Sequence, residues 1–282
     1  ATINCVKCPE RMPPDSGGSS SALSQHNRDS RLGRGSGLAI LRPMNMNPME
    51  PAAATRPVYP ARFTPHPPAL DNDWDGAAWA DATTLAVSHF RPESSTHRPR
   101  TLARLLHSPA GLSGIFRVED RFVRSVHTEY LSEVWKDSCV EFFARPRPER
   151  GYFNFEFNAG GAHLCSYIVN PERTPEGFKE FTRLPAELGR TVAVRSSLPR
   201  VIEPERVEPV TWTLQFFIPF ALFEHYIGPL GPLAGQTWRG NFFKCAEEVS
   251  HPHWAAWSPV DAFNFHLPHC FGEIRFEPAN AG

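Results

Sequence analysis

Apolar and polar residues alternate along most of the chain after residue 111, which is the pattern of β-strands rather than of helices. Successive side chains of a strand point to opposite faces, so a strand with one buried face shows a period of two. Pro, Gly, Asn and Asp residues interrupt the pattern, as expected for turns. The alternation predicts strands at residues 112–120, 138–146, 151–161, 163–170, 190–198, 210–219, 237–247 and 271–278.

One segment, FALFEHYI at residues 220–227, has the pattern of a short helix. Before the strands, RPVYPARFTPHPP at residues 56–68 is interpreted as an extended, proline-rich lead-in. Eight or more strands without alternating helices indicate antiparallel sheets, because parallel strands need long crossover connections. The predicted fold class is therefore all-β: an antiparallel β-sandwich or jelly roll with one short helix.

The composition changes sharply near residue 56. Every Phe, Tyr and Trp of the chain lies after this point. A segment without aromatic residues, rich in Gly, Ser and Pro, cannot bury enough apolar surface to offset the entropy lost on ordering. We expect residues 1–56 to form a disordered tail and residues 57–282 to form one domain. The tail lacks the basic and then apolar pattern of a secretory signal, so it does not identify the compartment.

Charge and hydropathy argue against two kinds of partner. Lys and Arg number 29 and Asp and Glu 30, and this formal net charge of -1 gives no strongly basic face for nucleic acid. No apolar run approaches the roughly 18 to 20 residues that cross a bilayer. We therefore expect a soluble protein that binds neither nucleic acid nor a membrane.

The strand at residues 151–161 carries chemistry on one face. Three phenylalanines are expected to point into the core: Phe153, Phe155 and Phe157. The opposite face presents a tyrosine, two amides and a carboxylate: Tyr152, Asn154, Glu156 and Asn158. Amides and carboxylates beside an aromatic ring are groups with which proteins hold sugar hydroxyls. A solvated outer face is the alternative, and the poor strand propensity of Asn and Glu favours binding only slightly.

An aspartate-rich motif bears on calcium. Asp71, Asp73 and Asp75 have the spacing of a calcium loop, but Ala82 stands where that loop needs a bidentate carboxylate. The alternative interpretation is an Asx-rich turn that leads Trp79 into the core.

The cysteines do not predict a metal or disulfide framework. Cys5 and Cys8 form one C-x-x-C, half of a zinc site without a second pair, which favours free thiols. The other four occur in apolar, strand-like contexts and are expected to be buried small hydrophobic residues, with one disulfide bridge as the alternative: Cys139, Cys165, Cys245 and Cys270.

Four segments in order resemble the family nine carbohydrate-binding modules, within the DOMON-like group of sandwiches. They are VWKDSCVEFF (134–143), YFNFEFNAGG (152–161), GNFFKCAEE (240–248) and FNFHLPHCFGEIRF (263–276), and the similarity runs from about Leu70 to Phe276. The resemblance implies a β-sandwich that binds mono- or oligosaccharides, often from plant cell-wall polymers, in polysaccharide catabolism. It also implies structural calcium, association with glycoside hydrolases and an extracellular or periplasmic location.

In this family the sugar is held between two aromatic side chains, and the resemblance implies which residues take part. Trp135 and Phe265 match the two aromatic positions, and Glu141, six residues after Trp135, matches a sugar-binding glutamate. Better-known members have tryptophan where Phe265 stands, so Trp257 is an alternative second platform. The predicted ligand-binding residues are Trp135, Glu141, Asn154, Glu156, Asn158, Trp257, Phe265 and His266.

Trp135 is expected to project from a loop at the rim of the site. Glu133 and Asp137 flank it at positions where a core residue of a strand would have apolar neighbours. An exposed indole ring could lie flat against the apolar face of a sugar.

Two alternatives concern the histidines and catalysis. His266 is expected to hydrogen-bond the sugar, whereas a zinc site would combine it with His251, His253 and His269. A glycoside hydrolase would need two carboxylates about 5 to 9 Å apart, which Glu141 and Glu156 on neighbouring strands could supply. No nucleophile motif such as G-x-S-x-G occurs, so binding without catalysis is the favoured function.

Overall fold

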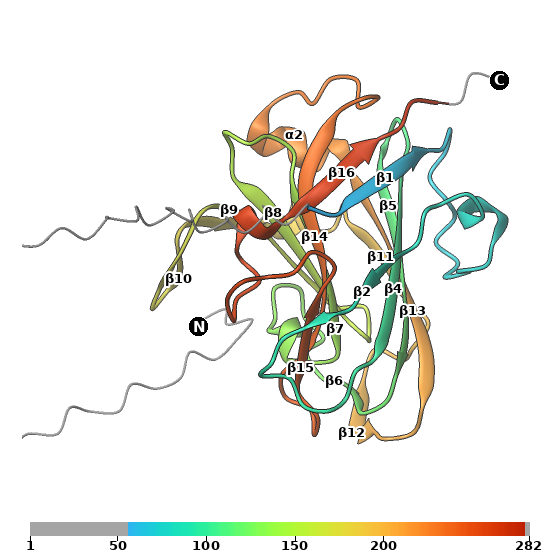
Figure 1. Ribbon diagram of the computed structural model, residues 1–282, viewed down its shortest axis with the longest axis vertical. Coiled ribbons are helices and arrows are strands. Elements are labelled where there is room, and N and C mark those ends of the chain that lie inside the picture. Colours follow the sequence, from blue (N-terminus) through green and yellow to red (C-terminus); the bar gives the residue numbers. More distant parts are fainter. Residues whose placement is uncertain (1–55, 280–282) are drawn as a thin grey trace, which may run out of the picture. The chain divides into compact units, whose positions relative to one another are not determined.

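Two β-layers face each other across an aromatic core, and the first strand belongs to both layers (Figure 1). The computed structural model describes residues 56–279. The first layer contains β3 (His89–Phe90), β7 (Cys139–Arg145), β8 (Tyr152–Asn158), β9 (His163–Thr174), β10 (Gly177–Arg183), β14 (Thr237–Ala246), β15 (His253–Ala256) and β16 (Gly272–Phe276). The second contains β2 (Leu85–Val87), β4 (Arg100–His107), β5 (Gly111–Asp120), β11 (Ala193–Ser196) and β13 (Val210–Pro219).

Strand β1 (Val58–Phe63) connects the layers. Its first part, residues 58–61, pairs in parallel with β16, and Arg62 and Phe63 then pair in parallel with β4. Figure 1 shows β1 (blue) running beside β16 (red). The strand order is β10-β9-β8-β7-β14-β16-β1 in the first layer and β1-β4-β5-β13-β11 in the second. A strand that leaves one sheet for the other forms a corner of the sandwich.

The remaining elements are short. A separate ribbon pairs β6 (Val123–Ser125) with β12 (Ile202–Arg206). The helices are α1 (Ala186–Gly189) and α2 (Phe220–Ile227), and the 3-10 turns are η1 (Ala77–Trp79), η2 (Val134–Lys136) and η3 (Pro268–Cys270). None of the helices within residues 56–279 has the length and apolar character needed to cross a membrane.

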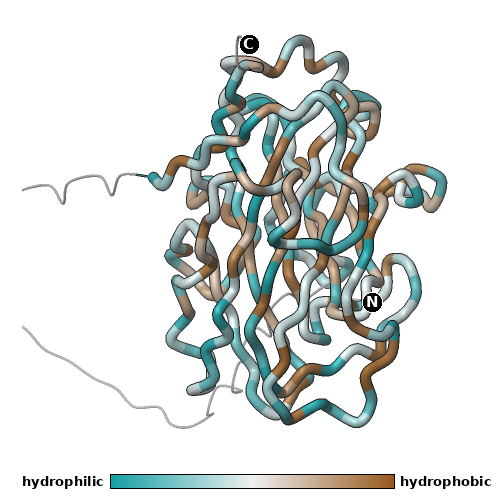
Figure 2. Tube along the Cα trace, turned by 90° about the vertical axis from the view of Figure 1, so that its right-hand side faces the viewer, coloured by the Kyte–Doolittle hydropathy of each residue, from teal (hydrophilic) through white to brown (hydrophobic). Residues whose placement is uncertain are grey.

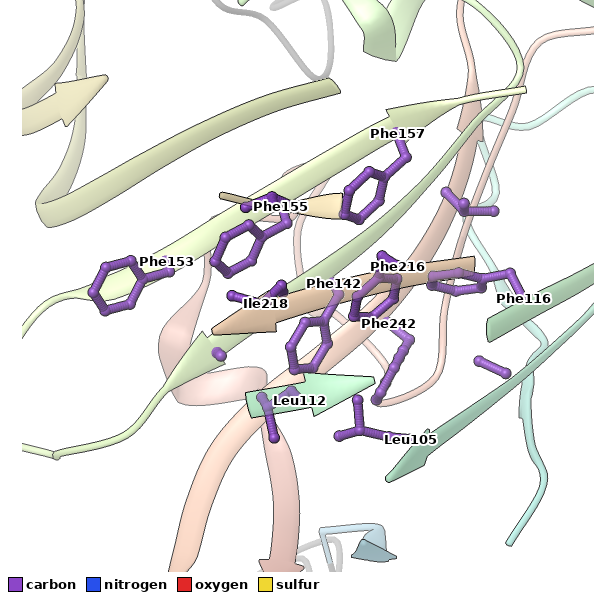
Figure 3. Packing of buried hydrophobic residues seen from close by; sticks show 14 of the residues in the cluster. Leu105, Leu112, Phe116, Phe142, Phe153, Phe155, Phe157, Phe216, Ile218 and Phe242 are labelled. Atoms are coloured by element: carbon purple, nitrogen blue, oxygen red, sulfur yellow. The ribbon is translucent and has the colours of Figure 1, made fainter. Parts of the chain in front are cut away.

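Phenylalanine rings fill the space between the layers, as the alternation in β8 predicts. The three phenylalanines of β8 lie in a row and face rings from the other strands (Figure 3): Phe142, Phe216 and Phe242. Phe157 stacks on Phe216 with ring centroids 5.2 Å apart, and Phe142 lies 4.9 Å from Phe242. Burial of one such side chain stabilises the fold by about 1.5–3 kcal/mol. The hydropathy colouring in Figure 2 shows the corresponding change between apolar and polar positions along the strands.

The predicted all-β sandwich is confirmed, and each of the eight predicted strands overlaps an observed one. The predicted helix at 220–227 coincides with α2. The interpretation of residues 56–68 as a lead-in was wrong, because this segment contains β1. At Pro60 the strand is paired on one side only, so a residue without an N–H group is tolerated there. The predicted tail and the Cys5–Cys8 motif lie outside the described residues, apart from Arg56.

Candidate functional site

Polar side chains from distant parts of the sequence lie together on one face of β7, β8, β9 and β14, the face that points away from the core between the layers. Strand register places Glu141 of β7 beside both Glu156 of β8 and Phe243 of β14. It also places Asn154 of β8 beside Ser166 of β9. We call this side of the first layer, away from the core, the outer face.

Three segments cover the outer face. The turn η2 brings Trp135, the hairpin of β9 and β10 brings Phe178, and a loop of residues 257–271, here called the cover loop, brings Phe265 and His266. Phe265 stacks on Phe243 with ring centroids 4.2 Å apart. Each of these side chains is buried, so the outer face is an enclosed second core.

The prediction of Trp135 at the rim was wrong, since its exposed fraction is 1%. Residues two positions apart share a face in a strand. Trp135 instead lies in a 3-10 turn with about three residues per turn, so Glu133 and Asp137 point elsewhere. Glu133 pairs with Lys136 at the surface. The buried Asp137 carboxylate accepts hydrogen bonds from two backbone N–H groups and from the Asn158 side chain.

The outer face is neither a solvated surface nor an open sugar platform. Asn154 and Glu156 are completely buried, and the Asn154 amide donates to Glu156 Oε1 over 2.7 Å. The Cys245 thiol donates to Glu141 Oε1 over 3.1 Å. Burial raises the pKa of Glu156 to about 8. At neutral pH Glu156 is therefore mainly a neutral carboxylic acid, which can donate a hydrogen bond as well as accept one.

Several polar atoms around this cluster make no hydrogen bond within residues 56–279. They are Trp135 Nε1, Asn154 Oδ1, Glu156 Oε2, Ser166 Oγ and His266 Nε2. A buried polar group without a partner costs roughly 1–3 kcal/mol, and folded proteins contain few of them. These atoms lie on one face, where a partner that carries both donors and acceptors would satisfy them.

Two of the predicted ligand-binding residues have other roles in the structure. Asn158 donates to the His127 carbonyl and to Asp137 and accepts from the Ala162 N–H, so its side chain holds the turn after β8. Trp257 packs edge-on against Tyr59 in the core between the layers. The structure therefore brings neither side chain to the buried cluster.

The four histidines considered as zinc ligands do not converge. His266 Nδ1 lies 2.9 Å from the Tyr152 hydroxyl, and His253 Nε2 lies 2.8 Å from Lys244 Nζ. His269 contacts the carboxylate of Asp261, and His251 stacks on Phe122. His266 does lie beside Phe265, as expected, and it reaches the outer face through Tyr152.

The aspartate motif forms the Asx-rich turn. Asp71 Oδ1 accepts from the Asp73 N–H and Asp73 Oδ1 from the Asp75 N–H, and Trp79 is buried after it. Structural calcium, which the resemblance implies, stays a prediction.

Of the four cysteines of the strands and cover loop, three are buried free thiols as predicted, and Cys270 is half-buried.

Comparisons with known proteins bear on the whole described region. Residues 78–276 match the model of Carbohydrate-binding family 9. A structure of a presumed carbohydrate-binding protein from Bacteroides uniformis is 27% identical, covers 79% of this chain and 100% of its own, and has a TM-score of 0.68. A search of curated proteins finds no significant match.

Two structures of a family 9 module from Caldicellulosiruptor kristjanssonii share the fold at 13% identity. The complex with cellotriose covers 80% of this chain and 96% of its own with a TM-score of 0.51. The complex with glucose covers 79% and 98% with a TM-score of 0.50. The residues matched by the family model include η2, β7, β8, β14 and the cover loop, and so the entire outer face.

Proposed function

Since this chain belongs to Carbohydrate-binding family 9, we propose that it binds a mono- or oligosaccharide on the outer face, beneath the cover loop. The membership confirms the resemblance found in the four sequence segments. One structural observation carries the location: the polar atoms without partners gather on this face and nearby aromatic rings border them. Sugars match such a site, because each hydroxyl both donates and accepts while the ring presents apolar C–H faces.

Polar and apolar side chains of the site would contact different parts of a sugar. Asn154 and the neutral carboxyl of Glu156 offer donors and acceptors side by side, and His266 Nε2 offers a further polar atom. Trp135 and Phe265 would supply the apolar surfaces for a sugar ring. Burial of those ring faces would contribute at about 25 cal/mol per Å² of apolar surface removed from water.

Binding at this place requires the cover loop to move. Phe265 lies against Phe243, so a sugar ring between Phe265 and the sheet would have to displace it. The base of the loop is held by the Asn241 side chain, which contacts the backbone of Ser258, and by Ser258 Oγ, which donates to the Cys270 carbonyl. The tip can therefore open while the two ends of the loop stay in place.

Glucose and cello-oligosaccharides are the first ligands to test, because the Caldicellulosiruptor module was solved with cellotriose and glucose. Xylo-oligosaccharides extend the test to other plant cell-wall chains. We propose association with a glycoside hydrolase as the setting in which such binding is useful.

Isothermal titration calorimetry of the full chain with these sugars tests the function. We expect binding by the wild type and loss of binding in Asn154→Ala. Gln215→Ala is the matched control, since Gln215 is an equally buried amide on the second layer, away from the outer face. Glu156→Gln should retain binding to within about tenfold at neutral pH, because a neutral amide resembles a neutral carboxyl. Absence of binding to every one of these sugars would contradict the proposal.

A glycoside hydrolase is the second candidate, on one specific observation. Glu141 and Glu156 are direct cross-strand neighbours, and the raised pKa of Glu156 suits a general acid. Product analysis after incubation with cello- and xylo-oligosaccharides distinguishes the two functions. Hydrolysis that disappears in Glu156→Gln, while sugar binding remains, would establish the enzyme.

A further inference from the structure

A second cluster of metal-ligand side chains lies outside the buried polar cluster, where the two sides of the cover loop approach each other. We call this place the neck of the loop. Asp261 stands near the start of the loop, and His269 and Cys270 stand near its end in the turn η3. One ligand atom of each residue lies within 4.8 Å of the other two. We propose that these three residues bind a divalent transition-metal ion of the zinc type.

The chemistry of the donors identifies the kind of ion. A thiolate, an imidazole and a carboxylate together suit Zn²⁺, whereas Ca²⁺ and Mg²⁺ take oxygen ligands. Three protein ligands leave a fourth tetrahedral position for water. His269 and Asp261 are 62% and 65% exposed, so an ion and its water can reach the cluster from solvent.

The nitrogen and oxygen donors lie close to the separation that zinc needs. His269 Nε2 and Asp261 Oδ2 lie 2.8 Å apart. Two donor atoms that each lie about 2.0–2.1 Å from a tetrahedral zinc ion are about 3.3 Å apart. Rotation of the two exposed side chains would have to separate the His269 and Asp261 donor atoms by only about half an ångström more. Cys270 Sγ lies within 4.8 Å of the ligand atoms of both Asp261 and His269, so all three side chains are close together.

The backbone around the cluster is fixed by other contacts. The Cys270 carbonyl accepts from Ser258 Oγ over 2.7 Å, and the Cys270 N–H donates to the Leu267 carbonyl. The positive charge of the nearby Arg56 disfavours a metal ion at this place. Its guanidinium group donates a hydrogen bond to the backbone carbonyl of His269. The negative charges of Asp261 and of a Cys270 thiolate offset this positive charge.

A buried alternative, Cys139 with Glu141 and Cys245, is less suited to an ion. All three side chains are fully excluded from solvent, and burial raises the pKa of the Cys139 thiol well above its ordinary value. Burial raises the pKa of the Cys270 thiol too, but the exposed Asp261 and His269 give an ion access to that cluster, which the buried one lacks.

An ion at the neck would join the two sides of the cover loop. Seven residues lie between Asp261 and His269, and they include Phe265 and His266 at the tip. The ion would hold the ends of the loop together while the tip covers the outer face. The metal site itself does not depend on sugar binding.

Cobalt and zinc titrations test the site directly, without any sugar. The sample is the full chain carrying Cys5→Ser and Cys8→Ser, so that these thiols give no signal, kept reduced and freed of metal with a chelator. With Co²⁺ we expect one equivalent to bind with a thiolate-to-cobalt charge-transfer band in the near ultraviolet. Cys270→Ser should remove the band, and His269→Ala should weaken zinc binding by at least about tenfold.

The controls separate this cluster from the rest of the chain. His66→Ala removes an exposed histidine elsewhere and should leave cobalt and zinc binding unchanged. Cys139→Ala should also retain the band, which excludes the buried cluster as its source. The proposal is overturned if the parent sample binds no metal, or if the band survives in Cys270→Ser. Since His269 is exposed, His269→Ala gives a result even if a cysteine variant fails to fold.

Discussion

At the scale of single residues, burial decides the chemistry of Trp135 and Glu156. Trp135 is in contact with the sheet because three residues adopt a 3-10 turn that packs on β7, β8 and β14. Glu156 is an ordinary strand residue whose side chain enters a second core instead of solvent. Both side chains are buried because other segments pack over the outer face. Substitutions of Trp135 or Glu156 are therefore expected to change the stability of the fold as well as any sugar binding.

Trp135→Ala is expected to lower the free energy of unfolding by about 3–5 kcal/mol, because it leaves a cavity the size of an indole ring. Chemical denaturation of the variant and of the wild type measures this change. Trp254→Ala, at a half-buried tryptophan, is the matched control and should cost less. A change within about 0.5 kcal/mol for Trp135→Ala, which is typical of surface positions, would contradict its burial.

Stability is expected to fall as the pH rises through the range set by Glu156. Burial raises its pKa from 4.5 to about 8, so above pH 4.5 the folded state keeps a proton that the unfolded chain releases. The folded state is therefore favoured fully below pH 4.5 and loses this advantage up to pH 8. The loss approaches about 1.4 kcal/mol per pH unit.

Urea denaturation between pH 5 and pH 8 checks this slope. Glu156→Gln should make the curve flatter, because an amide does not titrate. Glu247, whose pKa burial also raises to about 8, keeps part of the slope in that variant. Glu208→Gln, at an exposed residue, serves as the control and should leave the slope unchanged. An identical slope in Glu156→Gln and wild type would contradict the assignment.

At the scale of elements, the cover loop has anchored ends and a buried tip. Ser258 is tied to Asn241 on β14, and Phe265 and His266 are tied to Phe243 and Tyr152. The contacts at the tip are the ones that a sugar would replace. In the proposed function, the loop is the element that has to move for a sugar to reach the outer face.

Sugar association should therefore be limited by opening of the cover loop. In stopped-flow experiments followed by tryptophan fluorescence, we expect the observed rate to reach a plateau as sugar concentration increases. Phe265→Ala should raise the plateau rate, since it removes the ring that packs on Phe243. A rate that rises linearly to the highest concentration would indicate an outer face that is already open.

At the scale of the described domain, a buried charge network joins the two layers at one end. Lys244 of β14 is fully buried, and its Nζ lies 3.5 Å from Asp120 Oδ2 on β5 and 2.8 Å from His253 Nε2. His97 Nε2 contacts the other oxygen of Asp120 over 2.7 Å. Burial alone would raise the pKa of Asp120, but Lys244 and the His97 hydrogen bond hold it well below its ordinary value.

Asp120→Asn is expected to lower the free energy of unfolding by about 3–5 kcal/mol, because it leaves the Lys244 ammonium buried without its counter-charge. The double variant Asp120→Asn with Lys244→Met should recover much of this loss. Denaturation of the two single variants and the double variant gives the coupling energy of the pair. Additive losses would show that the two charges do not interact.

The sequence predicted the fold better than the site because strand periodicity is local information. Eight strands and the inward face of β8 follow from residues one and two positions apart, and α2 follows from residues three and four positions apart. Two of the strands that it missed show why. β1 contains Pro60, which argues against a strand, and in β4 the adjacent Leu105 and Leu106 interrupt the alternation.

For the candidate site, the sequence by itself determined which side chains of β8 face away from the core, because alternation along a strand fixes this whatever lies above it. The strand register of the folded protein decided that Glu141 of β7 joins them. Only the tertiary structure decided that Trp135 is buried, that Trp257 belongs to the other core, and that His269 meets Asp261 rather than His266. These outcomes depend on how η2 and the cover loop pack on a sheet formed by distant residues. No period along the chain encodes such contacts, since they arise from the balance of burial and hydrogen bonding in the folded state.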